Sequence, residues 1–541
     1  IERYTGSATP RRYRARLTAV TRTPSKGLLL TTLILGAGVA NINLSLANVA
    51  LPDISRDLQA SQVGTNLVGI GFTLGLAASV LYLGALGDRY GRRRLLLLGL
   101  SLSIPFALLA AWAPNVEILA VARILGGITA GMTYPTTLTF IVALFKGKER
   151  TSAIALWSGV GAAFSAIGPP LVGWLLTFAW WGAGFLIPIP LAVIALVLAW
   201  RLPRTSGEGD EKLDNLSGIV SVVMVTTLVL AITLAPLPGA GPVALSLGVL
   251  TIGLVTWFLL RQRRLDNPLY DLSIAKRRIF WVAAVAGIIV FGALMGAFFI
   301  GQQYLQDVLG YSSLSAGLSI IPTSIMLVAA APIAAKLINA YGSRITLLIG
   351  FAILAAGFLT MLAWRPDSSW ALVGIAYALL GTGVSIAAAP ASRSIMSAVP
   401  QAKLGMGSAT NDLQRDLGGA IMQSVMGSLL VVRYASSLRE SLSGIPEEQR
   451  QQVTDQTVTL MTSSFAGAEQ VASSLPQAQA STLMQWAADA FARGSGLAFA
   501  AALIAVAIGM AIVAFLFPNK AAEFAIEEQY AKADATQNSA E

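Results

Sequence analysis

The sequence contains neither cysteine nor histidine. Disulfide bonds, thiolate nucleophiles, imidazole bases and the usual zinc ligands are therefore excluded. No remaining side chain has an unperturbed pKa near 7, so proton chemistry has to use carboxylic acids whose surroundings favour the protonated form. We find no catalytic constellation and no phosphate-binding glycine loop of an ATP-driven pump. The sequence predicts a protein that is not an enzyme and that holds no metal and no cofactor.

Charge is also scarce in this chain of 541 residues. Only 12% of the residues are charged, 55% are hydrophobic, and the mean hydropathy is +0.69. A soluble domain carries about twice that share of charge, so the excess apolar surface must face lipid. The formal net charge of +10 is then a feature of membrane orientation and of contact with anionic lipids, and nucleic acid is not an expected partner.

Fourteen apolar runs are long enough to cross a bilayer, which needs roughly 20 residues each. They predict an all-α integral membrane protein with 14 transmembrane helices. Their small residues suit helices that touch closely inside a membrane. The predicted spans are 27–51, 62–86, 93–112, 116–145, 150–177, 180–200, 215–235, 242–261, 278–306, 313–340, 344–364, 369–398, 403–433 and 489–517.

The lysines and arginines set the expected orientation. If the N-terminus is cytoplasmic, most of the 37 basic residues fall in inner segments, as the positive-inside rule requires. An odd number of spans would break this pattern. We therefore expect a multi-pass protein of the plasma (inner) membrane with both termini cytoplasmic.

Two polar inner segments, 201–214 and 261–278, divide the spans into six, two and six. The stretch Tyr90–Gly99 aligns with Tyr341–Gly350 at an offset of 251 residues, and the same offset carries Gly168 onto Gly419. Two pseudo-symmetric bundles are what alternating access needs. The predicted divisions are a tail 1–26, a six-helix bundle 27–200, a linker with two extra helices 201–277, a second six-helix bundle 278–517 and a tail 518–541.

The long polar segment 434–488 is predicted to lie outside. It contains apolar positions that suit one or two amphipathic surface helices. It is either a cap over the outer mouth, or a dock for an extracytoplasmic partner, or a solvated connector. The two tails are expected to be disordered or interfacial.

The predicted inner loop between the second and third spans reads Gly84-Ala85-Leu86-Gly87-Asp88-Arg89-Tyr90-Gly91-Arg92-Arg93. Glycine permits a tight turn, and an acid among arginines can form charge-assisted bonds with a neighbouring helix end. Such a clasp would lock the inner face in one conformation, whereas the alternative is ordinary topogenic arginine. The candidate gating residues are Gly84, Asp88, Arg89, Gly91, Arg92 and Arg93.

With this loop the sequence resembles the major facilitator superfamily, and two further segments are similar to its fourteen-helix drug/proton antiporter branch. Arg123 stands three residues before Gly126-Gly127, and the fifth span has Gly168-Pro169-Pro170-Leu171-Val172-Gly173. The resemblance implies two six-helix bundles with two inserted helices and efflux driven by proton entry. It also implies a coupling or gating role for Arg123, with packing as the alternative. The antiporter motif would comprise Gly168, Pro169 and Gly173.

Gly126 replaces the branch's usual glutamine and Val172 one of its glycines, and one further departure is serious. Where its first span usually has D-x-T-x-x-N-V-A-L-P, this chain reads Asn43-Leu44-Ser45-Leu46-Ala47-Asn48-Val49-Ala50-Leu51-Pro52. An amide cannot carry a proton, so the commonest coupling acid is missing and Arg123 has no acidic partner in this span. We expect Arg123 to bind carbonyls, the amides of Asn43 and Asn48, or an anionic headgroup.

Only two of the 27 acidic residues lie deep in a predicted span. Asp412 is about 13 Å from Lys403 at the inner surface, at a rise of about 1.5 Å per residue, and Asp416 shares its helix face. Two buried carboxylates there cannot both ionise easily, although Arg415 stabilises the charged form. The predicted coupling residues are Arg123, Asp412, Arg415 and Asp416, and the alternative for the last three is a static structural network.

Amide and aromatic side chains on several spans are candidates for a substrate cavity. For each aromatic residue, the alternative is packing or contact with lipid. The cavity candidates are Asn43, Asn48, Tyr134, Trp157, Phe298 and Asn411.

Together with the family resemblance, which implies the direction of transport and the proton coupling, these features predict a secondary transporter that exports hydrophobic or amphipathic compounds by proton antiport, acting as a monomer among membrane lipids. Multidrug efflux and antibiotic resistance are the expected roles. The alternative is an exporter or flippase of lipids or lipid-like metabolites with weak or no proton coupling, which the missing acid at Asn43 favours.

Overall fold

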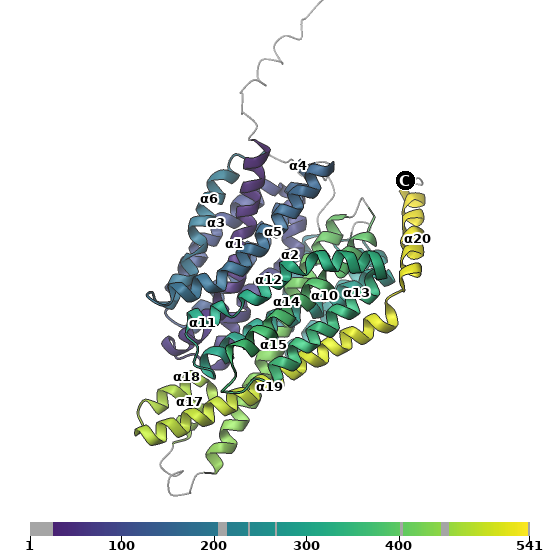
Figure 1. The fold of residues 1–541 in the computed structure, drawn as a ribbon. Helices are drawn as coiled ribbons and strands as arrows, with labels where there is room; N and C mark the ends of the chain where they lie inside the picture. The colour runs from purple at the N-terminus through teal and green to yellow at the C-terminus, as the bar shows by residue number, and fades with distance from the viewer. Residues whose placement is uncertain are drawn as a thin grey trace, which may run out of the picture.

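The computed structural model describes residues 25–145, 147–203, 214–235, 239–265, 268–400, 404–444 and 454–538. All regular structure in these residues is helical, as the apolar runs predict (Figure 1). The predicted tail 1–26 lies almost entirely outside the described residues.

The N-terminal part contains α1 (Lys26–Asp57), α2 (Gln62–Tyr90), α3 (Arg92–Ala111), α4 (Val116–Leu144), α5 (Gly147–Leu175), η1 (Trp181–Leu186) and α6 (Pro188–Ala199). Two helices follow, α7 (Asn215–Leu234) and α8 (Gly241–Gln262). The C-terminal part contains α9 (Leu272–Ala275), α10 (Arg278–Asp307), α11 (Ser313–Leu318), α12 (Ile321–Ala329), α13 (Ala331–Leu362), α14 (Trp370–Ser397), α15 (Leu404–Ser443), α17 (Asp455–Ser463), α18 (Phe465–Ala472), α19 (Gln477–Leu516) and α20 (Lys520–Asn538). We call α1–α6 the N-terminal half and α10–α19 the C-terminal half.

Twelve helices of the described residues are long and apolar enough to cross a membrane. The predicted span 150–177 corresponds to α5, a 29-residue helix that is not among these twelve. The predicted span 313–340 is broken into α11, α12 and the beginning of α13. Many large apolar side chains point outward, such as Leu245 with an exposed fraction of 70%. Such a surface requires lipid around it.

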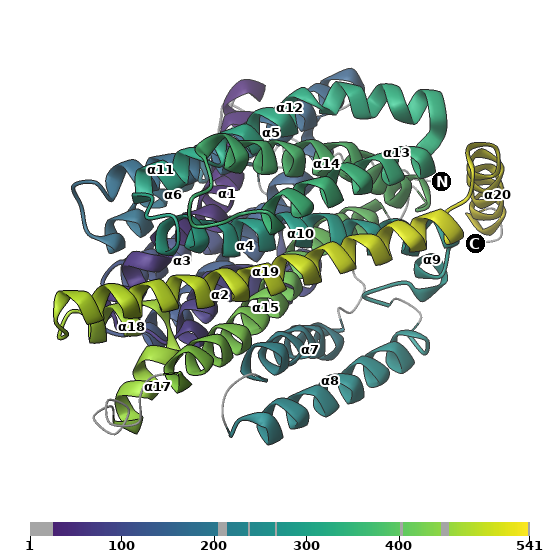
Figure 2. The same ribbon diagram turned by 60° about the horizontal axis from the view of Figure 1, so that its bottom comes forward.

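The helices α7 and α8 pack against each other at the side of the bundle (Figure 2), and α7 also contacts α2 and α15. Asp214, which caps α7, accepts two hydrogen bonds of 2.9 Å from Arg261 of α8. The Arg261 guanidinium lowers the pKa of Asp214 to about 2. The carboxylate therefore stays ionised in the physiological pH range and fastens the two helices together.

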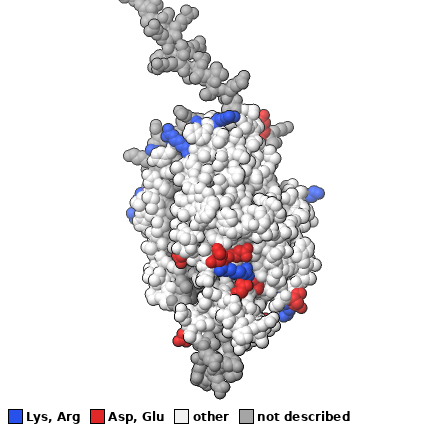
Figure 3. All heavy atoms as spheres, turned by 90° about the vertical axis from the view of Figure 1, so that its left-hand side faces the viewer, with Lys and Arg blue, Asp and Glu red and all other residues white. Residues whose placement is uncertain are grey.

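The two ends of the bundle differ in charge. The basic end is where α1 begins and where α2 meets α3, and it carries the run Arg92–Arg94. The acidic end is where α1 ends at Asp57 and α10 ends at Asp307. Most of the face in Figure 3 carries no charge, but basic and acidic side chains gather there in one compact mixed patch.

The internal repeat recurs in the backbone. Gly91 (φ 101°) and Gly342 (φ 83°), which are 251 residues apart, both adopt positive φ, a conformation that glycine adopts without steric cost. Arg93 donates a hydrogen bond to the carbonyl of Trp200 at the end of α6, and Arg344 donates one to the carbonyl of Ala514 near the end of α19. The two halves therefore close their basic ends by the same device, and Gly342 divides α13 into two helical segments.

Two segments with polar sequences are more ordered than the apolar pattern indicates. The segment 434–488, which we call the outer segment after its predicted side of the membrane, extends α15 and α19 beyond their predicted ends and contains α17 and α18 between them. The tail 518–541, expected to be disordered or interfacial, is not disordered over α20. Its Glu523 has an exposed fraction of 1% and accepts a hydrogen bond of 3.1 Å from the backbone N–H of Ser343, just after the Gly342 turn.

Candidate functional site

Arg415 of α15 forms the centre of the predicted coupling residues. Its Nε donates to Asp416 Oδ1 at 2.9 Å, and its Nη1 donates to the hydroxyl of Tyr134 at 2.8 Å. The guanidinium also lies over the Tyr134 ring, 4.4 Å from the centroid. Since Tyr134 belongs to α4, this contact joins the N-terminal and C-terminal halves.

The two acids of α15 have different partners. Asp416 is 1% exposed and holds Arg415, whereas Asp412 is 5% exposed and its Oδ2 has no hydrogen-bond partner among the described residues. The spacing suggests that Arg415 faces Asp412, but the guanidinium turns towards Asp416 and Tyr134 instead. A buried carboxylate without such a partner favours its neutral form. Asp412 is thus the acid in this cluster that is chemically suited to hold a proton.

Two of the predicted cavity aromatics lie together beside this cluster. Tyr134 and Trp157 of α5 have ring centroids 5.2 Å apart, and the Trp157 indole N–H donates to Thr137 Oγ1 at 3.0 Å. They therefore present an aromatic wall next to a cation and two acids.

Of the other cavity candidates, Asn411 lies on α15 one turn before Arg415, and the remaining three lie apart from the aromatic pair. Phe298 contacts Tyr377 of α14 at 5.9 Å between ring centroids, and Asn411 accepts a hydrogen bond from Gln414. Asn48 is buried on α1, and Asn43 lies beside Arg123. The structure thus does not bring the six predicted residues into one cluster.

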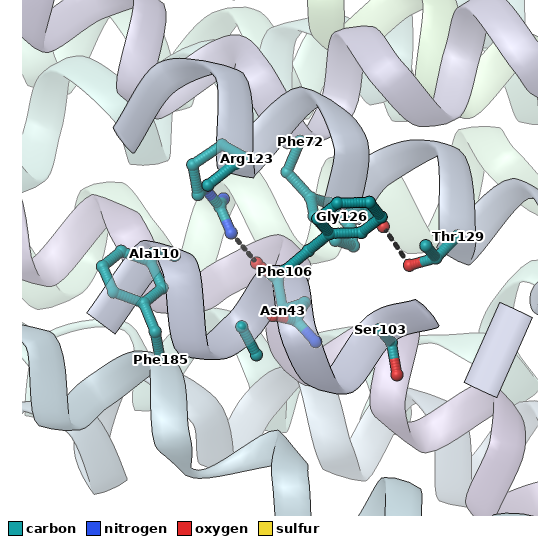
Figure 4. Close-up of a pocket in the computed structure, with 11 residues that line it drawn as sticks. Asn43, Phe72, Ser103, Phe106, Ala110, Arg123, Gly126, Thr129 and Phe185 are labelled. Atoms are coloured by element: carbon teal, nitrogen blue, oxygen red, sulfur yellow. Dashed lines mark hydrogen bonds between the residues drawn. The ribbon is translucent and has the colours of Figure 1, made fainter. Parts of the chain in front are cut away.

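Among the residues that the structure describes, Arg123 of α4 has only backbone acceptors. Its Nε donates to the carbonyl of Val68 at 3.4 Å and its Nη1 to the carbonyl of Asn43 at 3.1 Å (Figure 4). The side-chain N–H of Asn43 donates to the Val39 carbonyl, and the described residues show no hydrogen bond between Arg123 and the Asn43 side chain. Of the partners expected for Arg123, the carbonyls are therefore confirmed.

The antiporter motif lies where the two halves touch at the acidic end. A Cβ atom on Gly173 would lie 2.4 Å from the carbonyl oxygen of Ser313, and one on Gly317 would lie 2.6 Å from that of Pro169. Because any larger residue would clash with backbone there, α5 and α11 can approach this closely only through glycine. Gly168 is buried one residue before Pro169.

Arg56 is a functional candidate that the sequence reasoning missed. Its Nη2 lies 3.0 Å from Asp307 Oδ1, its Nε 2.7 Å from Glu469 Oε2, and its Nη1 3.6 Å from Asp53 Oδ1. One arginine of α1 thus joins α10 of the other half and α18 of the outer segment. Arg56 and Asp307 are 251 residues apart, so the repeat offset contained a signal for this pair.

Further hydrogen bonds close the acidic end around this ion-pair cluster. Gln62 Nε2 donates to Gln303 Oε1 at 2.6 Å, and Gln306 Nε2 donates to the carbonyl of Val49 at 2.8 Å. The outer segment is fixed by Tyr434, whose hydroxyl lies 3.1 Å from the carbonyls of Met461 and Ser464. The two halves are therefore sealed against each other at this end.

At the basic end, the predicted gating loop forms its turn at Gly91, while Gly84 lies within α2. The side chain of Asp88 lies outside the described part, so the predicted clasp around it stays a prediction. Arg89 lies over the Tyr90 ring, 5.9 Å from the centroid, and Arg92 begins α3.

The chain is similar to a known protein family over most of its length. The family model described as Major Facilitator Superfamily matches residues 33–423, which is well over half of the chain. The chain is 32% identical over 507 residues to the multidrug efflux pump LfrA of Mycolicibacterium smegmatis, covering 92% of this chain and 98% of the relative. It is 31% identical over 431 residues to the multidrug resistance protein Stp of Mycobacterium tuberculosis, covering 79% of this chain and 80% of the relative.

A solved structure has a similar fold. It is the inward-facing, occupied form of a bacterial homologue of the human lysosomal transporter Spinster, with a TM-score of 0.61 at 13% identity, covering 91% of this chain and 97% of that one. At this identity the likeness concerns the fold alone.

Proposed function

This chain belongs to the Major Facilitator Superfamily, a premise from which we propose that it is a multidrug efflux transporter for hydrophobic or amphipathic compounds. Family membership makes it a multi-pass membrane transporter and not an enzyme. The observation that carries the proposal is the 32% identity to a multidrug efflux pump over almost the whole length of both chains. The aromatic wall of Tyr134 and Trp157 beside Arg415 suits an amphipathic substrate.

The proposed topology has fourteen crossings, arranged as six, two and six, in the plasma membrane. Twelve apolar helices supply most of them; α5 and the broken helix formed by α11, α12 and the start of α13 supply the other two. The basic end would face the cytoplasm, because arginine and lysine remain on that side. Both termini are then cytoplasmic, and α17 and α18 are extracytoplasmic.

We further propose alternating access, in which the seal at the acidic end is one of two gates. Its ion-pair cluster around Arg56 and its close contact at Gly173 and Gly317 would part when the transporter opens outward. The outer helix α18 would act as a cap, because Glu469 joins it to Arg56. The clasp around Asp88 would close the opposite end.

Proton coupling is proposed for the cluster of α15. Asp412 is buried without a hydrogen-bond partner for Oδ2 among the described residues, while Asp416 occupies Arg415. A proton on Asp412 removes a buried negative charge, and its release would strengthen the attraction for Arg415 and so loosen Tyr134. Because Tyr134 belongs to the opposite half, protonation of Asp412 would change the contact that holds the two halves together at Arg415.

The test is transport by the purified full-length chain in proteoliposomes whose lumen is more acidic than the medium. Parallel assays use a cationic amphipathic dye and a fluorescent phospholipid, with protein-free vesicles as the control. We expect accumulation of the dye that collapses when an ionophore removes the pH gradient. Movement of the phospholipid alone, unaffected by the gradient, would contradict the proposal and favour the lipid exporter.

A further inference from the structure

The guanidinium of Arg123 lies inside the N-terminal half without a counter-ion among the described residues. Arg123 has an exposed fraction of only 3%. Its two hydrogen bonds go to the neutral carbonyls of Val68 and Asn43, and its Nη2 has no hydrogen-bond partner among the described residues. A buried charge without a partner of opposite sign is unfavourable in a protein interior. The buried guanidinium therefore favours a ligand of negative charge at this site.

Aromatic rings surround the guanidinium but do not neutralise it. The carbon at its centre lies 4.9 Å from the ring centroid of Phe72 and 5.5 Å from that of Phe185. In Figure 4 these two rings lie to either side of the Arg123 head group, which points towards Asn43. The rings attract the cation through their quadrupoles, yet they carry no net charge.

A small cavity adjoins this cation. Its volume is about 20 Å³, and Arg123, Asn43, Ser103 and Thr129 are its polar lining residues. The hydroxyls of Ser103 and Thr129 donate to carbonyls of their own helices, but a hydroxyl can rotate to donate elsewhere. The Asn43 amide has a second N–H beyond the one that binds Val39. The cavity therefore offers several donors and one positive charge.

We propose that this cavity binds one small monovalent inorganic anion, of which chloride is the abundant representative. The anion would pair with Arg123 and accept hydrogen bonds from the Asn43 amide and the two hydroxyls. A volume of about 20 Å³ holds one particle near the size of a water molecule, which excludes an organic substrate. Water fits the volume but leaves the charge uncompensated, so an anion is the better occupant.

The experiment measures binding of radioactive chloride and thermal unfolding on the purified full-length chain, without substrate and without a gradient. Unfolding is compared in chloride, in bromide and in gluconate, which is too large for the cavity, at equal ionic strength. We expect one saturable chloride site and a higher unfolding temperature in chloride and bromide, because a ligand that binds the folded state stabilises it. Equal unfolding temperatures in all three salts without saturable chloride binding would overturn the proposal and leave water as the occupant.

Two variants and a matched control assign the site. Arg123→Gln removes the cation, and Asn43→Asp keeps the cation but supplies a fixed negative charge, so each should weaken chloride binding at least about tenfold, within the range of typical coupling between sites. Asn41→Asp introduces the same charge two residues earlier on α1, where the amide contacts Ser165 and does not line the cavity. It should keep the chloride response. Loss of the response in Asn41→Asp but not in Asn43→Asp would contradict the assignment.

Because chloride binding is measured without transport, its failure is separate from a failure of the proposed export. Dye accumulation with no chloride site would refute only the anion, and a chloride site in a chain that moves no dye would refute only the export.

Discussion

Arg123 and Arg415 are both arginines buried in membrane helices, and their surroundings differ in one respect. Each lies over an aromatic ring, Phe72 at 4.9 Å for Arg123 and Tyr134 at 4.4 Å for Arg415. Arg415 also has a carboxylate at 2.9 Å, whereas Arg123 has only carbonyl acceptors among the described residues. In the proposed mechanism the region around Arg415 changes its charge by taking up or releasing a proton, whereas the described residues place no carboxylate in contact with Arg123.

In the proposed mechanism the two halves have different tasks. The C-terminal half holds the two acids of the cluster, Asp412 and Asp416, and the N-terminal half supplies a fixed positive charge together with the phenol that Arg415 binds. The repeat places Gly374 where the N-terminal half has Arg123, since the two positions are 251 residues apart. The halves thus share a backbone plan but not a charge distribution, and only their combination forms the coupling cluster.

The largest expected effect is the loss of folding stability on removal of Arg415, and removal of Arg123 is its comparison. Arg415→Gln leaves Asp416 buried without its cation, and we expect a loss of about 3 to 5 kcal/mol of folding stability. Arg123→Gln removes a cation that lacks a carboxylate partner, so in chloride-free buffer its stability should stay within about 1 kcal/mol of the original. Unfolding of the two purified variants at neutral pH measures the contrast. Equal losses of stability in the two variants would contradict the claim that only Arg415 compensates a buried carboxylate.

A second prediction concerns a variant, Asn43→Asp, that places a carboxylate beside Arg123. Asn43→Asp should form a charge-assisted interaction worth about 1.5 to 3 kcal/mol. The gain should exist while the introduced carboxylate is ionised and should disappear as the pH falls and the group takes up a proton. Unfolding at several pH values measures it, with Asn41→Asp as the control. A pH-independent gain, or one shared by the control, contradicts this reading.

A third prediction tests the link between the halves at Arg415. Tyr134→Phe keeps the ring but removes the hydroxyl that accepts the 2.8 Å hydrogen bond, with an expected cost of about 1.5 kcal/mol, because the donor is charged. We also expect weaker dependence of transport on pH. Tyr82→Phe is the matched control, since the Tyr82 hydroxyl donates to Asn215 of α7 and does not bind Arg415. Equal pH profiles for the two variants would remove Tyr134 from the coupling mechanism.

The smallest effect concerns the cluster at the acidic end, where Arg56 has a side chain that is 34% exposed. Arg56→Gln should cost about 1 kcal/mol or less, and salt should mimic it, unlike the change at the buried Arg415. Because the chain has no cysteine, a single cysteine in place of Gln303 reports opening by its labelling rate. Labelling should rise in Arg56→Gln and stay unchanged in Arg493→Gln, which breaks only an exposed pair with Glu440. No rise would exclude Arg56 as a gate residue.

Sequence reasoning succeeded where membrane physics restricts the choice. A charge inside a bilayer is expensive, so the census of acids identified Asp412 and Asp416, and both are buried. The glycines in the predicted loop between the second and third spans indicated a tight turn, and Gly91 forms it with a positive φ. The absence of an acid for Arg123 was likewise readable from Asn43.

Partner choice was not readable, because spacing along a helix does not fix the direction of a long side chain. Arg415 lies one turn from Asp412 yet binds Asp416 and a tyrosine of another helix. The contact between Arg56 and Glu469 joins residues 413 positions apart and depends on the packing of the outer segment. Likewise, Phe298 faces Tyr377 of its own half instead of the Tyr134 cluster.

The central claim is that the acids of α15 couple export to proton entry, and two transport modes measured on the same variants test it most directly. The variants are Asp412→Asn, Asp416→Asn and their combination, and the control is Asp455→Asn, which alters an exposed acid of α17. Accumulation driven by a pH gradient needs a proton to bind and leave, whereas exchange between equal pools of dye does not.

We predict that Asp412→Asn and the double variant lose gradient-driven accumulation and keep dye exchange, while the control keeps both. Full gradient-driven accumulation in the double variant would contradict the claim and make the cluster of Arg415, Asp412 and Asp416 a structural network.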